Sequence, residues 1–429
     1  MPDVLNHPKI DLDQRLLSAQ QLKLLRVIAE AADTRQTPLY LVGGFVRDLL
    51  LHIPAMDFDL VVEGDAIALA RALATQYGGR VTAHARFGTA QWFQPDSDSH
   101  ALDFISTRSE TYKHPGALPT VKPGRLADDL FRRDFTINTL ALRIDGEHWG
   151  ELYDEMDGLS DLKRGLVRIL NPQSFLDDPT RLFRAVRYEQ RYGFQIAPET
   201  LILIPPARGL IGSLSAERIR HELDLILEEE KAVAMLNRLA ELDLLQPIHP
   251  TLAWNDIKRE RFINGWRLAQ DHHKKTIPLS VGKSCINWHF WLMDLSLTDI
   301  ESLERRLHFH AHLLGSLLAA SALFIDLPSL TGMKPSQCVT RLEELPLTAV
   351  YAVFLSVPDG EARQNLYDYL ETWRYIKPKT NGHDLKKRGL PPGPRYQQVL
   401  SRLRQARLDG EVKTEIEEME LLDILTKLV

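Results

Sequence analysis

The chain has 429 residues, of which 44% are hydrophobic and 26% are charged. These values are typical of a globular protein with two to four domains. No apolar run reaches the roughly 20 residues that a membrane-spanning helix needs, and the N-terminus carries no basic region followed by an apolar core. The two cysteines are too few for a disulfide framework or a cysteine-based zinc site. We therefore expect a soluble, cytoplasmic protein with no membrane partner.

The formal net charge of −6 argues against a broad surface for non-specific nucleic-acid binding, although a local basic groove is compatible with it. Near the C-terminus a run of cations is opposed mainly by Asp384; it comprises Lys386, Lys387, Arg388, Arg395, Arg402, Arg404 and Arg407. Such a run is usually a solvated helix face, so by itself it is weak support for RNA binding.

Hydrophobic periodicity and turn residues predict the elements of the first 145 residues in chain order. A first helix covers residues 16–32. It is followed by a buried strand, a short helix, a second strand and a helix that Gly78-Gly79 ends; their predicted ranges are 39–42, 46–51, 60–62 and 66–77. Three alternating stretches then indicate antiparallel strands, at 80–84, 89–93 and 102–107. Residues 135–143 form a strand or a helix that closes this unit.

Beyond about residue 170, strand signals nearly vanish and leucine-rich helical patterns continue to the end. We therefore expect an α+β protein: an N-terminal head with a mixed sheet, followed by an all-α remainder.

The most informative motif is Asp57-Phe58-Asp59, which precedes the second predicted strand. Carboxylates at positions i and i+2 of a strand project from the same face. Such a pair can hold two divalent cations roughly 4 Å apart, the arrangement used for displacement at phosphorus. Upstream, Gly43-Gly44 supplies a turn of bare backbone amides that could cradle a triphosphate, with Arg47 on the next helical turn.

Two further stretches of the head carry chemistry. Asp103 lies on a later strand; if that strand places it beside the Asp57–Asp59 pair, it can ligate a metal ion and accept the proton of an attacking hydroxyl. In the string from Arg132 to Asn138, consecutive arginines stand beside an aspartate and an asparagine. Arginine forks onto phosphate oxygens and asparagine can meet a sugar hydroxyl, so this string suits a nucleotide.

The third motif is Asp177-Asp178-Pro179-Thr180-Arg181, at the start of a predicted helix. Pro179 fits the first turn and Asp178 the N-cap, so capping is one explanation for this acid. Arg181, Arg184 and Tyr188 share one helical face. A carboxylate beside a guanidinium matches the edges of cytosine and adenine, whereas uracil and guanine would leave groups unpaired. The protein could thus select C and A without a nucleic-acid template.

Together these motifs resemble those of class II tRNA nucleotidyltransferases, which belong to the DNA polymerase β superfamily together with bacterial poly(A) polymerases. The resemblance is carried by Gly43-Gly44-x-x-Arg47-Asp48, Asp57-x-Asp59, the string Arg132–Asn138, Asp177-Asp178-x-x-Arg181 and the neck-like Ala216–Leu223. It covers the head and neck closely, the tail moderately, and residues 245–375 hardly at all.

This resemblance implies a five-stranded head sheet and four domains: a catalytic head at 1–145, a helical neck for base recognition at 146–245, a helical body at 246–375 and a tRNA-binding tail at 376–429. It implies that Asp57 and Asp59 bind Mg²⁺ and that Asp103 assists as the third acid. The implied nucleotide contacts are Gly43, Gly44 and Arg47 to the triphosphate, Arg133, Asp134 and Asn138 to the nucleotide, and Asp178 and Arg181 to the base, supported by Arg184. Residues 108–119 resemble a flexible loop that helps to switch from C to A addition.

The expected function is template-independent addition of C and A from CTP and ATP to the 3′ end of tRNA, with the acceptor arm gripped by the helical domains. We expect a monomer or a weak dimer. Three alternatives remain: a half-enzyme that adds only A or only the two Cs, a poly(A) polymerase, and an RNA-binding protein without catalysis. The acidic C-terminus, with Glu415, Glu417, Glu418 and Glu420, disfavours a poly(A) polymerase, which commonly ends in a basic extension.

Overall fold

The computed structural model describes residues 7–12, 17–54, 58–95, 101–111, 120–271 and 282–427. The chain forms two compact units, and each is described separately. The first contains Met1–Leu214 and Leu242–Pro247, and the second contains Ser215–Glu241 and Ile248–Val429. The four-domain division stays a prediction.

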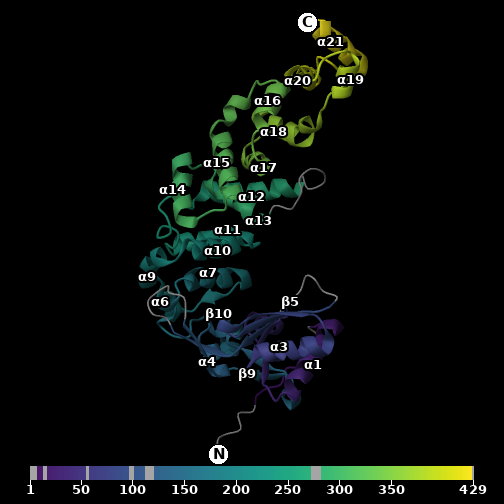
Figure 1. Ribbon diagram of the computed structural model, residues 1–429. Coiled ribbons are helices and arrows are strands. Elements are labelled where there is room, and N and C mark those ends of the chain that lie inside the picture. The colour runs from purple at the N-terminus through teal and green to yellow at the C-terminus, as the bar shows by residue number, and fades with distance from the viewer. Residues whose placement is uncertain are drawn as a thin grey trace, which may run out of the picture. The chain divides into compact units, whose positions relative to one another are not determined.

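A seven-stranded sheet forms the centre of the first unit (Figure 1). The strand order is β3-β4-β5-β2-β1-β8-β9, and β2 and β5 run parallel while the other neighbours are antiparallel. The strands are β1 Leu39–Val42, β2 Asp59–Val62, β3 Arg80–His84, β4 Thr89–Phe93, β5 Ala101–Ser106, β8 Ala141–Arg143 and β9 Glu151–Tyr153. The expectation of a mixed sheet is confirmed. The expected number of five strands was wrong, because the described sheet has seven.

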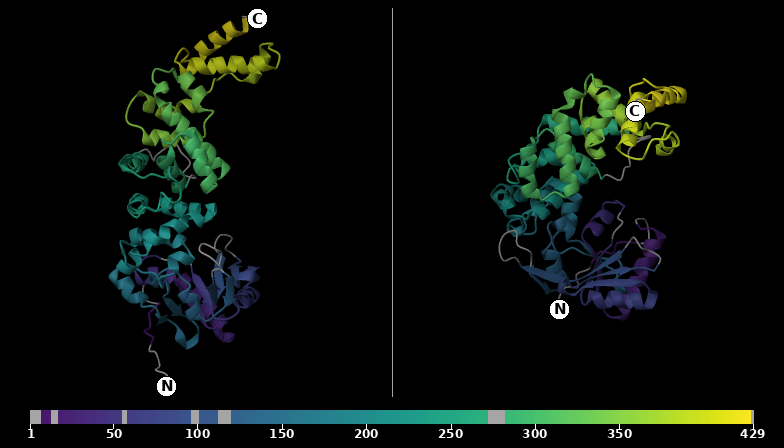
Figure 2. Two further views of the ribbon diagram at one scale, coloured as in Figure 1. Left: turned by 90° about the vertical axis from the view of Figure 1, so that its left-hand side faces the viewer. Right: turned by 45° about the horizontal axis from the view of Figure 1, so that its top comes forward.

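Helices cover both faces of this sheet. α3 (Ala66–Tyr77) packs on β3, β4 and β5 and is itself covered by α1 (Ala19–Thr34). On the other face, α4 (Leu126–Phe131) buries two leucines against side chains of β1, β2 and β8. Figure 2 gives two further views of this layered arrangement. Asp59 shares its face with Val61, and Asp103 with Ile105, so both acids lie on the α4 side of the sheet.

Local sequence explains where the head helices begin and end. Ser18 caps α1 by accepting from the Gln21 backbone amide at 3.2 Å, and the Gln21 side chain accepts in turn from the Ser18 amide at 2.9 Å. α3 ends at Gly78, and both Gly78 and Gly79 have the positive φ that L-residues disfavour. The predicted ranges of β1, β3, β4 and α3 are confirmed. Residues 135–143 were expected to form a strand or a helix, and they contain both a 3-10 helix, η2 (Thr136–Asn138), and the strand β8.

The rest of the first unit is mainly helical. Its key helix for the site is α7 (Thr180–Tyr192), which buries Leu182, Ala185 and Val186 on one face. The remaining elements are α2 Gly44–Leu50, η1 Ala85–Phe87, β6 Arg108–Thr111, β7 Thr120–Pro123, η3 Gly146–His148, α5 Gly158–Arg164, β10 Leu166–Val167, α6 Ser174–Asp177, β11 Gln195–Ile196, α8 Pro198–Leu201, α9 Ile204–Ala207 and η4 Arg208–Ser213. The hairpin β6–β7 carries the loop of the predicted flexible segment, whose residues 112–119 lie outside the described part.

The described part of the second unit is all-α, as expected (Figure 1). An aromatic cluster forms part of its core, with Trp288 stacked on Trp291 and Trp254 packed edge-on against Trp291 and Phe262. Its elements are α10 Ala216–Glu228, α11 Ala232–Glu241, α12 Asp256–Asp271, α13 Lys283–Leu292, α14 Leu297–Leu307, α15 Ala311–Ile325, η5 Leu327–Leu330, α16 Pro335–Leu342, α17 Leu347–Ser356, α18 Glu361–Glu371, η6 Trp373–Tyr375, α19 Gly382–Lys387, α20 Pro394–Leu408 and α21 Glu415–Lys427.

Most arginines of the C-terminal basic run are paired with carboxylates outside the run. The pairs are Arg388–Asp423, Arg402–Glu411, Arg404–Glu343 and Arg407–Glu418. The view that Asp384 mainly opposes this run was therefore wrong, because folding brings two acids of α21, Glu343 at the end of α16 and Glu411 after α20 against it. Among the described residues, no helix combines the length and apolarity needed to cross a membrane.

Candidate active site

The two parallel strands β2 and β5 bring two carboxylates side by side. Asp59 is the register partner of Asp103, and both are exposed, whereas their strand neighbours Leu60 and Phe104 are fully buried. Gln91 of β4 is the next register partner, and its side-chain amide donates to Asp103 Oδ1 at 2.9 Å. The prediction that Asp103 lies across the sheet from Asp59 is confirmed, and Gln91 is a neighbour that the sequence analysis missed.

Asp57, the remaining acid of the predicted metal site, lies outside the described residues. Among the described ones, no group of three or more potential ligands from His, Cys, Asp or Glu comes together. Asp59 and Asp103 nevertheless fit a hard cation, because carboxylate oxygens are the ligands that Mg²⁺ prefers and the ion is commonly held by one or two carboxylates plus substrate phosphates.

The glycine turn lies directly beside this pair of acids. Gly43 has a φ of +66°, which favours glycine. A Cβ atom at this position would stand 2.5 Å from Arg133 Nη1 and 3.6 Å from Asp59 Oδ2. The bare backbone, the acid and the guanidinium therefore meet at one point. The Gly43 amide itself donates to the Leu140 carbonyl at 3.2 Å, so the Arg133 guanidinium is the donor beside Asp59 that suits a phosphate group next to a metal ion.

Four of the predicted nucleotide-binding residues belong to one largely buried network. Arg47 is 3% exposed and donates to Asn138 Oδ1 at 2.6 Å. Asn138 Nδ2 donates to Asp134 Oδ1 at 2.8 Å, and Arg184 Nε donates to Asp134 Oδ2 at 2.7 Å. The structure thus joins α2, η2 and α7 through side chains. Direct contact of these residues with a nucleotide stays a prediction; what the geometry gives them is a positioning role.

The network closes through groups that the sequence analysis did not assign. Arg47 Nε and Nη2 donate to the two oxygens of Asp48 at 2.9 and 3.0 Å. The Tyr192 hydroxyl donates to Asp48 Oδ1 at 2.9 Å, and burial raises the pKa of Tyr192 to about 12, which keeps that proton in place. The Arg47 guanidinium also lies over the rings of Tyr188 and Tyr192, an attractive arrangement for a cation.

Asp134 carries the negative charge at the centre of this network. Burial works to raise the pKa of Asp134, but the charge of Arg184 and the hydrogen bonds from Asn138 and Arg184 outweigh burial, and the pKa is lowered. Asp134 is therefore ionised at neutral pH and holds Asn138 and Arg184 in fixed orientations.

A second buried acid, Asp129 of α4, organises the two consecutive arginines. Its Oδ1 accepts from Arg132 at 2.7 Å and its Oδ2 accepts from Arg133 at 3.0 Å. Arg132 also reaches Glu110 of β6 at 3.1 Å. Asp129 was missed, although its position three and four residues before the arginines on a helix could have indicated it.

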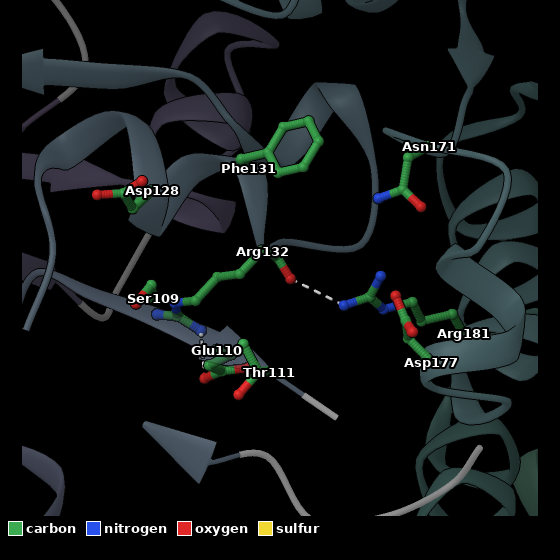
Figure 3. A pocket seen from close by; sticks show the side chains of 9 residues that line it. All are labelled: Ser109, Glu110, Thr111, Asp128, Phe131, Arg132, Asn171, Asp177 and Arg181. Carbon is green, nitrogen blue, oxygen red and sulfur yellow. Dashed lines mark hydrogen bonds and ion pairs between the residues drawn. The ribbon is translucent and has the colours of Figure 1, made fainter. Parts of the chain in front are cut away.

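A pocket of about 380 Å³ lies between α4, the strand β6 and the start of α7 (Figure 3). Arg181 is on its wall, donating to Ser174 Oγ at 2.5 Å and to the Arg132 carbonyl at 2.8 Å. Figure 3 shows the Asp177 carboxylate beside this guanidinium. Burial raises the pKa of Asp177. The positive charge of Arg181 works against this shift, and the negative charge of Asp178 adds to it. The pocket is lined by Ser109, Glu110, Thr111, Asp128, Phe131, Arg132, Asn171, Asp177 and Arg181.

Asp178, which was predicted to read the base, is not among the residues that line this pocket. Its Oδ1 accepts from the Thr180 amide at 3.0 Å and from the Thr180 hydroxyl at 2.6 Å, directly before the first turn of α7. Capping was the competing explanation from the sequence, but α7 begins at Thr180, one residue later than predicted, and its N-cap residue is Pro179. Contact of Asp178 with the base stays a prediction. Asp177 is the acid that lines the pocket together with Arg181.

Residues 39–168 match the family model described as "Poly A polymerase head domain", and residues 193–255 match "Probable RNA and SrmB- binding site of polymerase A". The chain is 36% identical to an A-adding tRNA nucleotidyltransferase of Geobacter sulfurreducens, over 96% of this chain and 48% of that protein. It is 32% identical to an A-adding tRNA nucleotidyltransferase of Halalkalibacterium halodurans, over 91% of this chain and 89% of that protein.

The fold is similar to that of a CCA-adding enzyme of known structure. The Thermotoga maritima CCA-adding enzyme complexed with tRNA aligns with a TM-score of 0.75 at 27% identity, over 96% of this chain and 97% of that one. The chain thus spans about half the length of its Geobacter relative and nearly the whole of the Thermotoga structure.

Replacing Asp134 by asparagine should destabilise the first unit in a pH-dependent way. At pH 7 we expect a loss of about 2–3 kcal/mol, because Arg184 would lose its charged partner in a largely buried site. A depressed aspartate pKa contributes stability that is fully present above the unfolded-state value of about 3.9 and is lost as the pH falls through the folded-state value. The free energy of unfolding, measured with urea, should therefore differ less between wild type and Asp134→Asn below about pH 4.

The exposed Asp256 provides the matched control, since Asp256→Asn at a surface pair should cost less than about 0.5 kcal/mol at every pH. If Asp134→Asn lowers the free energy of unfolding by the same amount from pH 7 to pH 3, the role assigned to the Asp134 charge would be contradicted.

Proposed function

The chain belongs to the tRNA nucleotidyltransferase family, and on that premise we propose that it transfers a nucleotide from a nucleoside triphosphate to the 3′-hydroxyl of a tRNA, releasing pyrophosphate. The observation that carries this proposal is the pairing of Asp59 with Asp103 across β2 and β5, beside Gly43 and Arg133. A protein that had kept only RNA binding would have no need for two exposed acids in register next to a glycine turn.

Among the possible specificities, addition of A alone is favoured. Two relatives that match over more than nine-tenths of this chain are named A-adding enzymes. Addition of the complete CCA sequence is the second candidate, supported by the close fold similarity to a CCA-adding enzyme. The proposed substrates are accordingly ATP, with CTP in the second case, and a tRNA with an incomplete 3′ end.

Asp59 and Asp103 would hold Mg²⁺, together with Asp57. When bound, this cation would neutralise phosphate charge and lower the pKa of the attacking 3′-hydroxyl. The 3′-oxygen forms its bond to the α-phosphorus while the bond from this phosphorus to the bridging oxygen of pyrophosphate breaks. An acid of this cluster accepts the hydroxyl proton. The Gly44 amide and the Arg133 guanidinium would bind the triphosphate, since the Gly43 amide is engaged with the Leu140 carbonyl. Much of the acceleration would come from this fixed positioning.

The base would be selected in the pocket beside α7. A guanidinium has five N–H groups, and the contacts of Arg181 with Ser174 and Arg132 use two of them. Those contacts fix its plane, and the adjacent Asp177 carboxylate offers an acceptor for an exocyclic amino group. Adenine and cytosine present an amino group beside a ring acceptor, so both can pair with such a donor–acceptor set. Asp178 would support the site by fixing Thr180 at the start of α7, and it stays a candidate for reading the base.

The helical second unit would bind the tRNA backbone through cations that are not engaged in ion pairs. Within the described residues, Lys386, Lys387 and Arg395 have no carboxylate partner within ion-pair distance, unlike the paired arginines of α20. These three residues flank the turn between α19 and α20 and are candidates for phosphate contacts, with affinity that falls as salt rises.

Alanine at Asp57, Asp59 or Asp103 should reduce nucleotide transfer by roughly a thousandfold or more, since several kcal/mol of charge stabilisation are lost. Both described acids are exposed, so the variants should fold, which urea unfolding checks. Asp256→Ala is the control for removing one exposed carboxylate and should leave transfer unchanged. Wild-type transfer rates in Asp59→Ala or Asp103→Ala would refute the proposed metal ligands.

The specificity is decided by supplying purified protein with three tRNAs, one lacking CCA, one ending in C and one ending in CC, each with ATP or CTP alone. An A-adding enzyme should extend only the tRNA ending in CC, by one residue and only with ATP. Incorporation of CTP into the two shorter tRNAs would instead identify a CCA-adding or CC-adding enzyme. Long adenylate tails on unrelated RNA would identify a poly(A) polymerase.

A further inference from the structure

Phe131, the last residue of α4, is unusually placed for a phenylalanine. The leucines of the same short helix, Leu126 and Leu130, are buried against the sheet, whereas Phe131 is 50% exposed. A position on the solvent side of an amphipathic helix normally carries a polar residue. A single exposed apolar side chain is common on protein surfaces and needs no functional explanation by itself.

What distinguishes Phe131 is the pocket that it lines. The same pocket is lined by Arg181, Asp177 and Asn171, which offer hydrogen-bond donors and acceptors (Figure 3). Figure 3 shows the Phe131 ring on the α4 side, while Arg181 and Asp177 project from the side of α6 and α7. A pocket lined by one exposed aromatic ring and a few polar groups has the composition of a nucleobase site, in which a ring stacks on one face of the base while hydrogen bonds read its edge.

We propose that Phe131 is a stacking platform for the base of the incoming nucleoside triphosphate. The inference rests on the proposed function, because it takes the pocket beside Arg181 to be where the base is selected. Arg133 lies two residues after Phe131 on the same chain segment, and its guanidinium reaches Gly43. The segment from Phe131 to Arg133 therefore contributes to the base pocket at one end and to the triphosphate site at the other.

This placement favours the incoming nucleotide over the RNA as the stacking partner. The side chain of Arg132, between the two, is fixed by Asp129 and Glu110. A rigid backbone link between ring and triphosphate site suits a single ligand that has both a base and phosphates. Stacking is tolerant of base identity because every base has a π-face, so Phe131 would supply affinity while Arg181 and Asp177 supply selectivity.

The test measures nucleotide binding in the absence of RNA, so it does not depend on transfer activity. In Phe131→Ala, the Kd for ATP should rise roughly 5- to 160-fold, the equivalent of the about 1–3 kcal/mol that base stacking contributes. Phe131→Tyr keeps the ring and should bind ATP within about twofold of wild type. Phe131→Leu keeps the apolar bulk without the ring and should also bind more weakly, which covers the case in which the alanine variant folds poorly.

Two controls separate stacking from a general structural effect. Inorganic tripolyphosphate carries no base, so its Kd should be the same in Phe131→Ala and in wild type. Phe87 is 46% exposed and lines a different pocket of the same unit, so Phe87→Ala should leave the Kd for ATP unchanged.

Unchanged ATP binding in Phe131→Ala would overturn the proposal, as would an equal loss of affinity for ATP and tripolyphosphate. A rise in the KM for tRNA without any change in ATP binding would overturn it too, because Phe131 would then stack on RNA. If wild type binds ATP through Phe131 but transfers no nucleotide to any tRNA, the proposed function fails while the stacking assignment stands.

Discussion

The parallel register of β2 and β5 is the constraint on which the candidate site depends. In a sheet where all other neighbouring strands are antiparallel, this one pair sets Asp59 opposite Asp103. A shift of one residue in either strand would turn its acid to the opposite face, under α3. The apolar side chains around them fix the register, because Leu60 and Phe104 are buried on one face while Val61 packs on the other. The hydrophobic core thereby positions two charged groups.

Around these acids, largely buried ion pairs connect elements that are far apart in the chain. Arg47 of α2, Asn138 of η2 and Arg184 of α7 meet through Asp134. Such a network is costly unless every member is satisfied, and here each charged group has a partner of opposite charge or an oriented hydrogen bond. It gives the site a rigid wall. In a sequence, the residues that form such a wall resemble residues that bind a nucleotide directly, although the contacts that the structure shows for them are with other residues of the protein.

Much of the head could be predicted from sequence, because periodicity and glycine turns mark β1, α3, β3 and β4 directly. The convergence of Asp59 with Asp103 was also predictable, from the resemblance. Partners of long side chains were not, since they depend on tertiary packing: Asp129 holds the two arginines, and the C-terminal arginines are held by acids of other helices. Asp177 and Asp178 illustrate the same limit, because adjacent acids look alike in sequence, whereas folding places Asp177 in the pocket lining and Asp178 against Thr180.

The most direct measurement is anomalous diffraction from crystals of the protein grown with Mn²⁺ and a non-hydrolysable ATP analogue. The account predicts manganese peaks within coordination distance of the Asp59 and Asp103 carboxylates, with the analogue's phosphates reaching the Gly43 turn and Arg133. Manganese bound to the nucleotide away from both acids, or an analogue seated outside the head, would contradict it.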